Sequence, residues 1–378
     1  MTRWAIITGE YPPLPGGVSD YTYQVSRGLV ACGDTAHVFT VGSDANSLPT
    51  DSGITVTRLP GRFGLCSLNA LERLMVMRPQ PERILVQYVP QAFGWKGMNL
   101  PFAVWLATRA WRIAPVDVML HEVVFPFSWR PMKHAVLGAG TRTMARLVGR
   151  AADRVFVSIP AWGNLLKRIC PRVKPPMWLP VPCTLDANPT PDAVATARVK
   201  FAARGVLVGH FGTFGAGVVA LLTPLLVDLL VRTPAVVVLV GRGSMLFTEQ
   251  FITNHPEHRG RIVATGELSA DAVSAHLRAC DLLVQPFPDG VSSRRTSVMA
   301  GLANGVATVT NLGALSEPLW ANGAVAVVAS PDPVALAHLA GELLLDPAWR
   351  EKLGNRGLAL YRDLFAIEHT IAKLRGTA

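Results

Sequence analysis

The segment WAIITGEYPPLPGGVSDY, residues 4–21, contains a strand, a loop and a helix start, and it sets the pattern for the rest of the chain. The apolar run from Trp4 to Thr8 predicts a buried strand. A loop rich in proline and glycine follows, and then apolar residues at spacings of three and four from Val18 predict an amphipathic helix. Strand, loop and helix in this order are typical of a parallel α/β sheet.

The same alternation continues and predicts two doubly wound α/β domains. Strands are predicted at residues 4–8, 36–40, 54–58, 83–87, 116–121 and 154–158, and again at 206–211, 235–240, 262–264, 282–285, 307–310 and 324–328. Seven prolines between Pro171 and Pro191 exclude a continuous helix and predict a linker. We therefore expect domains at residues 1–178 and 179–355, followed by a helical segment at 356–378.

Composition excludes several classes of protein. Half of the 378 residues are apolar and 16% are charged, which excludes a disordered chain. The apolar runs are too short for a transmembrane helix, and we expect no secretory signal. The five cysteines are far apart, so we expect a reduced, cytoplasmic protein without a metal site. The net charge of +10 favours anionic ligands and allows peripheral contact with the inner face of a membrane; without a recognition motif, we do not expect nucleic acid.

Loops between strands and helices are the candidate binding sites, because backbone N–H groups of helix starts converge there on anions. Gly16 and Gly17 let the backbone approach an anion at the first helix, and an ordinary helix cap at Ser19 or Asp20 is the alternative. In the second half, two glycine-containing loops are expected to face a nucleotide, with Gly212, Thr213, Gly241, Arg242 and Gly243. Neither loop forms the G-x-G-x-x-G pattern of dinucleotide oxidoreductases.

The segment from Gln285 to Ala300 combines a strand end, hydroxyl groups and two arginines. Arg294 and Arg295 are predicted in the first turn of a helix, where the helix dipole disfavours a cation by about 0.3–1 kcal/mol. A bound anion would reverse that penalty, so we predict that these arginines bind a diphosphate. The alternative is that an arginine extends into solvent or pairs with Asp289.

Polar and aromatic residues also follow strands of the first half. His121 ends one strand, and the loop after Gln87 is both aromatic and polar, which suits a polyhydroxylated ligand. A hydrogen-bonded structural histidine is the alternative for His121. We predict an acceptor side made of Tyr11, Gln87, Trp95, Asn99 and Glu122.

Together these motifs resemble the retaining GT-B glycosyltransferases of the family-4 type, over nearly the whole chain. The resemblance rests on Glu10-Tyr11-Pro12-Pro13 with Gly16-Gly17, on His121, on Gly241-Arg242-Gly243 and on the strand from Asp281 to Pro286. It implies two facing Rossmann-like domains with a deep cleft between them, the first for an acceptor and the second for a nucleotide diphosphosugar, with the last helix returning to the first domain. It also implies retaining, hexosyltransferase-like transfer to a saccharide, lipid-linked or natural-product acceptor, without a cofactor, in carbohydrate biosynthesis.

The resemblance assigns roles to residues and shows two departures from the family. His121 supports the reacting sugar, and the sugar hydroxyls are held by Asp289 and by the backbone of Gly290, Val291, Ser292 and Ser293. The family's donor motif has two glutamates separated by seven residues, whereas this chain has Asp289 and Ser297. The family's arginine and lysine in the first loop of the second domain are also missing, so Arg294 or Arg295 is predicted to supply that charge. The alternative is a non-catalytic nucleotide-sugar-binding or scaffold protein.

Overall fold

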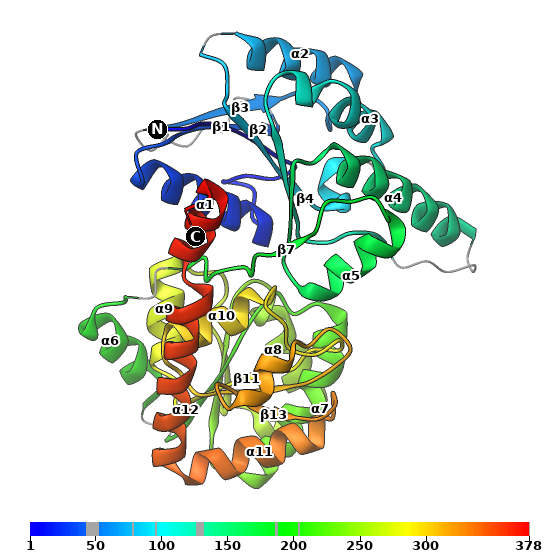
Figure 1. Cartoon of the computed structure of the whole chain (residues 1–378). Coiled ribbons are helices and arrows are strands. Elements are labelled where there is room, and N and C mark those ends of the chain that lie inside the picture. The colour runs from blue at the N-terminus through cyan, green and yellow to red at the C-terminus, as the bar shows by residue number, and fades with distance from the viewer. Residues whose placement is uncertain are drawn as a thin grey trace. The chain divides into compact units, whose positions relative to one another are not determined.

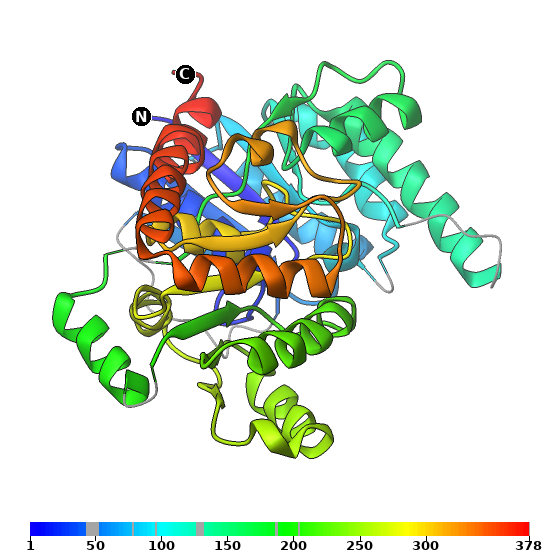
Figure 2. The ribbon, with the colours of Figure 1, turned by 90° about the horizontal axis from the view of Figure 1, so that it is seen from below.

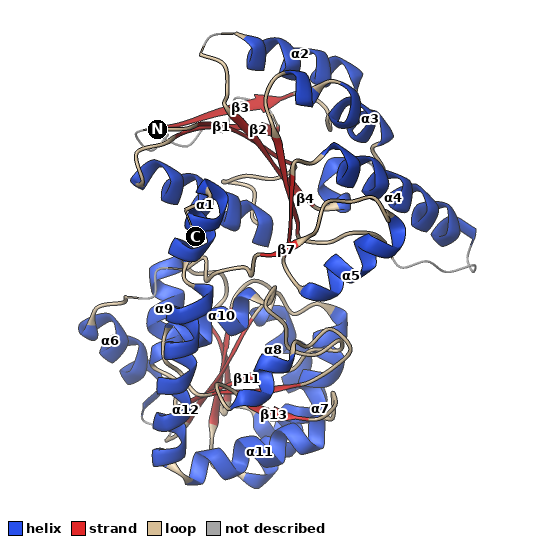
Figure 3. Ribbon diagram, viewed as in Figure 1, coloured by secondary structure: helices blue, strands red, loops and turns tan. Residues whose placement is uncertain are grey.

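The structure is a computed structural model, and it describes residues 1–42, 53–77, 79–94, 97–125, 132–185, 188–202 and 205–377. The chain divides into two compact units (Figure 1). Unit 1 comprises Met1–Pro180 and Ile367–Ala378, and unit 2 comprises Val181–Ala366. Each unit has its own parallel sheet with helices on both faces, which confirms the fold class expected from the sequence (Figure 3).

In the described part of unit 1, seven parallel strands form a sheet in the order β3-β2-β1-β4-β5-β6-β7. The strands are β1 Arg3–Thr8, β2 Thr35–Val41, β3 Ile54–Leu59, β4 Arg83–Tyr88, β5 Val116–Leu120, β6 Arg154–Val157 and β7 Met177–Trp178. Their apolar runs are continuous because helices cover both faces. In β1, Ala5 and Ile7 pack in one core cluster, and the alternate residues Trp4 and Ile6 are buried on the opposite face.

Helices of unit 1 divide between the two faces of this sheet. The face of Ala5 and Ile7 packs against α2 Leu65–Val76, α3 Leu100–Thr108, α4 Met132–Ala151 and α5 Pro160–Ile169, with the short turns η2 Pro90–Phe93 and η3 Ala110–Arg112. On the other face, α1 Gly17–Ala31 and α13 Ile367–Arg375 lie side by side, although they are far apart in the sequence (Figure 2). Gly28 permits this contact, because a Cβ atom there would lie 2.6 Å from Ile371.

The described residues of unit 2 form a six-stranded parallel sheet in the order β10-β9-β8-β11-β12-β13. The strands are β8 Leu207–Phe211, β9 Val236–Val240, β10 Ile262–Ala264, β11 Leu282–Gln285, β12 Thr308–Asn311 and β13 Ala326–Val328. The helices are α6 Pro191–Ala202, α7 Ala216–Arg232, α8 Ser244–Asn254, η4 Pro256–His258, α9 Ala270–Arg278, α10 Thr296–Ala303, η5 Pro318–Asn322, α11 Pro333–Leu345, α12 Pro347–Leu360 and the π-helical η6 Tyr361–Phe365. None of the described helices is both long and apolar enough to cross a membrane.

All of the segments predicted as strands contain one, with boundaries that differ by at most two residues. The structure adds β7, which lies inside the proline-rich segment and forms an edge of the first sheet. Prolines lack the N–H group that a central strand must donate, so an edge is the position in a sheet that tolerates them nearby.

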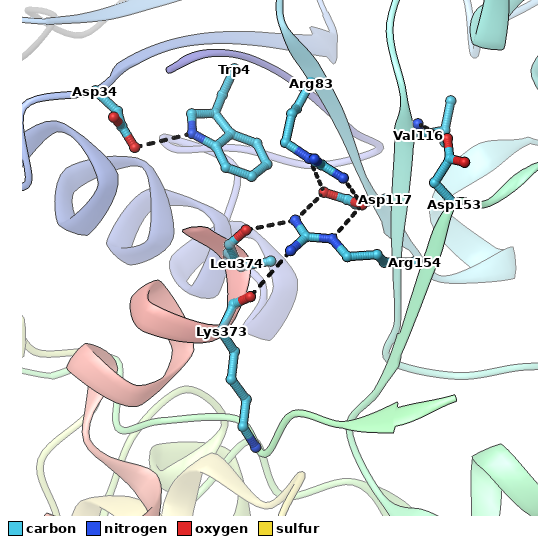
Figure 4. A network of polar contacts seen from close by, with 9 residues as sticks. All are labelled: Trp4, Asp34, Arg83, Val116, Asp117, Asp153, Arg154, Lys373 and Leu374. Carbon is cyan, nitrogen blue, oxygen red and sulfur yellow. Dashed lines mark hydrogen bonds and ion pairs between the residues drawn. The ribbon is translucent and has the colours of Figure 1, made fainter. Parts of the chain in front are cut away.

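A buried carboxylate connects three strands of unit 1 at their amino ends (Figure 4). The Asp117 side chain in β5 has no exposed surface. Arg83 of β4 donates to it through Nε and Nη2, at 2.9 and 3.1 Å, and Arg154 of β6 donates through the same two atoms, at 2.9 and 2.6 Å. The two guanidinium groups compensate the cost of burying this charge.

Arg154 also holds the end of α13 against the rest of unit 1. Its guanidinium donates to the carbonyl oxygens of Leu374, at 2.6 Å, and Lys373, at 3.4 Å. Carbonyls in the last turn of a helix lack intrahelical donors and carry the negative end of the helix dipole, so a cation stabilises them. A second contact, from Arg375 Nε to Asp34 Oδ2 at 3.0 Å, attaches the same helix end to the loop before β2.

We expect Asp117→Asn to lower the free energy of unfolding by about 3 kcal/mol, because two partly buried guanidinium groups then lose their carboxylate. Denaturant titration followed by circular dichroism measures the change. Asp228→Asn is the matched control, since Asp228 pairs with Arg232 on the surface of α7 and its loss should leave stability near the parent value. Equal effects of the two substitutions would contradict a stabilising role of the Asp117 network.

Candidate functional site

The strand order of each sheet reverses at one position, and ligands of open α/β sheets bind at the carboxyl ends of the strands beside such a position. In unit 1 the reversal lies between β1 and β4, next to the loop of Gly16 and Gly17. In unit 2 it lies between β8 and β11. The loops after β9, β8 and β11 are therefore neighbours along one edge, and they contain Gly241–Gly243, Gly212–Thr213 and Asp289–Ser293.

The turns after β8 and β9 touch through their backbones. Gly241 has a φ of +113°, and a Cβ atom there would lie 2.5 Å from the carbonyl oxygen of Gly212. Gly243 has a φ of +88° directly before α8, and a Cβ atom there would lie 3.2 Å from the Thr213 oxygen. Arg242 between them pairs with the exposed Glu267 at 2.7 Å. Glycine at these positions thus brings the amino ends of α7 and α8 together, where N–H groups favour an anion.

The two arginines of unit 2 share one carboxylate. Arg294 Nη2 lies 2.5 Å from Asp289 Oδ2, and Arg295 forms an ion pair with the other oxygen of the same carboxylate. The Arg295 guanidinium also lies 4.5 Å above the ring of Phe287. Two guanidinium groups face one carboxylate, so this trio carries a net charge of +1 at the amino end of α10.

The placement of these arginines in the first helical turn was wrong. α10 begins at Thr296, Arg295 is its N-cap with extended backbone, and Arg294 lies in the preceding turn. The ion pairs with Asp289 hold both side chains back toward the loop after β11, which a helical periodicity does not predict. Ser297 lies in the first turn of α10 and is half-buried.

A buried glutamate fixes the rest of this loop. Glu317 is 6% exposed and accepts hydrogen bonds from the Ser293 backbone N–H, at 3.1 and 3.2 Å, from the Ser293 hydroxyl and from Trp320 Nε1, at 2.7 Å. Gly290 has a φ of +86°, and a Cβ atom there would lie 2.3 Å from the Gly313 nitrogen. Val291 is buried and donates its N–H to the backbone carbonyl oxygen of Asn311 at 2.8 Å. The backbone from Gly290 to Ser293 is therefore held from two sides.

In unit 1, His121 follows β5 and is buried. Its Nε2 lies 2.9 Å from Gln87 Oε1, and its ring lies edge-on to Tyr21 with centroids 4.8 Å apart. Burial lowers the pKa of His121 from 6.5 to about 3, so the imidazole is neutral at pH 7. With Nε2–H donating to Gln87, Nδ1 keeps a lone pair that can accept a hydrogen bond from a ligand hydroxyl.

The glycine loop of unit 1 already contains an anion. Glu10 Oε1 accepts from the backbone N–H groups of Val18, at 3.2 Å, and Ser19, at 3.3 Å, at the start of α1. A Cβ atom on Gly16 would lie 2.5 Å from the same oxygen, whereas one on Gly17 would meet nothing within 4 Å. Burial raises the pKa of Glu10. The first amides after the predicted Gly16 and Gly17, those of Val18 and Ser19, are thus occupied by the chain's own carboxylate.

The remaining predicted acceptor residues differ in how they are placed. Tyr11 is buried and packs edge-on to Tyr23, with centroids 6.2 Å apart. Glu122 accepts from Gln91 Nε2 at 3.0 Å, close to the carboxyl end of β5. Asn99 caps α3, accepting from the Phe102 N–H and donating to the carbonyls of Arg62 and Phe63. Trp95 lies outside the described residues.

Solved structures resemble the chain along its whole length. Sucrose-phosphate synthase from Thermosynechococcus elongatus has a TM-score of 0.77 and 19% identity, covering 100% of this chain and 98% of the other. Anabaena HepE in complex with UDP and glucose has a TM-score of 0.71 and 16% identity, covering 100% of both chains. WaaG, a glycosyltransferase involved in lipopolysaccharide biosynthesis, has a TM-score of 0.70 and 15% identity, covering 98% of this chain and 99% of the other. No protein-family model and no curated protein matches the sequence.

The chain has the GT-B fold. Within this GT-B chain, two further buried polar residues lie near the carboxyl ends of β8 and β11, and the sequence analysis did not predict them as site residues. His210 donates its Nδ1–H to the backbone carbonyl oxygen of Val284 at 2.8 Å, and burial lowers its pKa to about 4. The amide of Gln285 is buried and has no hydrogen-bond partner among the described residues. A polar residue at the end of the apolar run Leu282–Gln285 is the sequence signal that could have marked Gln285 as a candidate.

In the described ranges no group of three or more His, Cys, Asp or Glu side chains could hold a metal ion.

Two buried histidines of the GT-B chain, His121 and His210, predict acid sensitivity. Their pKa values lie near 3 and 4 in the folded state and near 6.5 when unfolded, so the unfolded chain binds more protons below about pH 6.5. Stability is therefore fully present above that pH and is lost as the pH falls, by up to about 1.4 kcal/mol per pH unit for each histidine.

Denaturant titrations between pH 7 and 4.5 measure this slope. His121→Gln and His210→Gln should each reduce it, whereas His338→Gln, at an exposed position of α11, should not. A slope that is unchanged in both buried-site variants would show that these histidines are not neutral in the folded protein.

Proposed function

We propose that this chain is a glycosyltransferase that transfers a sugar from a nucleotide diphosphosugar to a hydroxyl group with retention of configuration. The observation that carries the proposal is the edge of the second sheet, where the amino ends of α7, α8 and α10 and the Asp289 trio follow three adjacent strands. Backbone N–H groups and guanidinium groups are the donors that a diphosphate requires. The likeness to HepE, which was solved with UDP and glucose, supports the same ligand class.

In this proposal unit 2 binds the donor and unit 1 binds the acceptor. The backbone at Gly212, Gly241 and Gly243 approaches the diphosphate, and Arg294 or Arg295 balances its charge. Asp289 can accept hydrogen bonds from sugar hydroxyls while it holds both arginines, because a carboxylate has about four lone-pair positions. His121, as a neutral imidazole, supports the reacting sugar through Nδ1.

The proposed reaction needs no protein nucleophile. The bond from the anomeric carbon to the phosphate oxygen breaks, and a bond to the acceptor oxygen forms on the same face. The departing phosphate takes the proton of the acceptor hydroxyl, so the charges balance. Guanidinium and N–H groups fixed before the reaction stabilise the negative charge that develops on the leaving group. The proposed setting is cytoplasmic carbohydrate biosynthesis with a saccharide, lipid-linked or natural-product acceptor, and the net charge of +10 supports peripheral contact with anionic lipids.

A thermal-shift comparison of UDP, GDP, ADP and TDP selects the nucleotide, because a ligand of the folded state raises the melting temperature. Release of the nucleoside diphosphate from the matching sugar donor then separates an enzyme from a non-catalytic binding protein. One feature favours the non-catalytic binding protein: Ser297 stands in place of the second carboxylate of the family's donor motif. Tight binding without turnover, with every acceptor class, would contradict the proposed transfer and support that alternative.

Arg295→Ala is expected to weaken binding of the selected nucleoside diphosphate at least tenfold, because a charge-assisted hydrogen bond contributes about 1.5–3 kcal/mol. Folding should be little affected, since Asp289 keeps its ion pair with Arg294. Isothermal titration measures the affinity, and Arg259→Ala, at an exposed position of the same unit, is the control. If the double variant of Arg294 and Arg295 binds like the parent, the diphosphate is held by other groups.

A further inference from the structure

Arg58 is a buried cation that the proposed reaction does not use. It lies near the carboxyl end of β3 and is 8% exposed. Its Nη2 donates to the carbonyl oxygen of Pro12, in the loop after β1. Within the described part of the chain, no carboxylate pairs with Arg58 and its buried Nε–H has no acceptor. A guanidinium has five N–H donors, so the described residues leave most of its hydrogen-bonding capacity unused.

Several other partly buried arginines of this chain have two or more hydrogen bonds to carboxylate or carbonyl oxygens. Arg83 and Arg154 face the carboxylate of Asp117. Arg261, in unit 2, donates through Nε and both Nη atoms to the carbonyls of Leu230, Thr233 and Ala235. A buried charge without such partners is costly, because it loses its hydration and gains little in return. Arg58 is therefore placed where a partner from outside the chain would stabilise it.

A second buried donor without a partner lies beside Arg58. Thr40 of β2 is the register partner of Arg58, and register partners on neighbouring strands point to the same face about 4.8 Å apart. The Thr40 hydroxyl is fully buried and has no partner among the described residues. Gly42 leaves room near the guanidinium, since a Cβ atom there would lie 3.5 Å from Arg58 Cδ and 3.8 Å from Nη1.

The negative charge in the adjoining loop is already held elsewhere. Glu10 lies in the same loop as Pro12, but its carboxylate accepts from the amides of Val18 and Ser19 at the start of α1. The two donors of Arg58 and Thr40 thus remain together at the carboxyl edge of the first sheet, two strands from the reversal between β1 and β4. This is the edge at which ligands of such sheets bind.

We propose that Arg58 and Thr40 form an anion subsite that binds a phosphate group carried by the acceptor sugar. The inference rests on the proposed function, because it assigns a chemical class to the acceptor of that reaction. A phosphate monoester has three strong acceptor oxygens, and this subsite offers it the Nε–H, the Nη1 group and the Thr40 hydroxyl as donors. Because the guanidinium binds the phosphate group, the subsite selects a phosphorylated acceptor over a neutral sugar.

Thermal shift and isothermal titration of the full chain test the subsite with four probes: inorganic phosphate, glucose 6-phosphate, glucose and UDP. Inorganic phosphate tests the anion site independently of the sugar. We expect phosphate and glucose 6-phosphate to raise the melting temperature of the parent and glucose to have no effect. Arg58→Gln should weaken the binding of both phosphate probes at least tenfold and leave UDP binding intact. Arg58→Lys should retain part of the phosphate binding. The control Arg62→Gln, at an exposed neighbouring position, should bind all probes like the parent.

Stability without ligand separates an anion site from a purely structural arginine. Removing a poorly compensated buried charge should leave the melting temperature of Arg58→Gln at or above that of the parent, whereas a structural role predicts a lower one that no anion restores. The inference is overturned if neither phosphate probe stabilises a parent protein that responds to UDP, or if inorganic phosphate binds and glucose 6-phosphate does not. It is also overturned if Arg58→Gln weakens the binding of UDP as much as the binding of glucose 6-phosphate. Binding of glucose 6-phosphate through Arg58 by a chain that binds no nucleoside diphosphate supports the subsite and contradicts the proposed function.

Discussion

The complete burial of the Asp117 carboxylate is the constraint on which unit 1 depends. A carboxylate in that position requires cations, and Arg83 and Arg154 supply them from the first residues of the two flanking strands. The register of β4, β5 and β6 follows, because a slip by one residue would turn a guanidinium to the opposite face. The three residues of this network lie at the amino ends of the strands, whereas His121 follows the carboxyl end of β5, so the two lie at opposite ends of the strands.

Unit 2 is constrained by close approach of backbones. A side chain at Gly241 would collide with the Gly212 carbonyl, and one at Gly290 would collide with the Gly313 nitrogen. These two contacts fix the loops that follow β8, β9 and β11, and Glu317 fixes the segment that leads into α10. The candidate donor residues are therefore carried on loops that their neighbours hold in position, which is what a preorganised site requires.

Most of the fold could be predicted from local pattern, and most contacts of the site could not. A run such as Val236–Val240 is apolar, β-branched and short, so it specifies a buried strand without knowledge of its neighbours. The pairing of both arginines with Asp289, and of Glu10 with the α1 amides, depends on loop conformations that residue spacing does not encode. Glu317 lies 24 residues after Ser293, and no motif marks it. Arg58 is one basic residue in a strand, and it is distinguished by its burial and by the lack of a carboxylate partner among the residues that the structure describes.

The position of α13 has a consequence for biosynthesis. Arg154 and Asp34 complete their hydrogen bonds with residues of α13, which follows the whole of unit 2 in the sequence. While a ribosome is still synthesising unit 2, residues 1–180 have emerged without the helix that packs on α1. The Arg154 guanidinium and the Asp34 carboxylate then lack these partners, and the surface at Gly28 is uncovered by Ile371. The first unit to be translated is therefore the last to be completed, which departs from the usual order in which domains fold as they emerge.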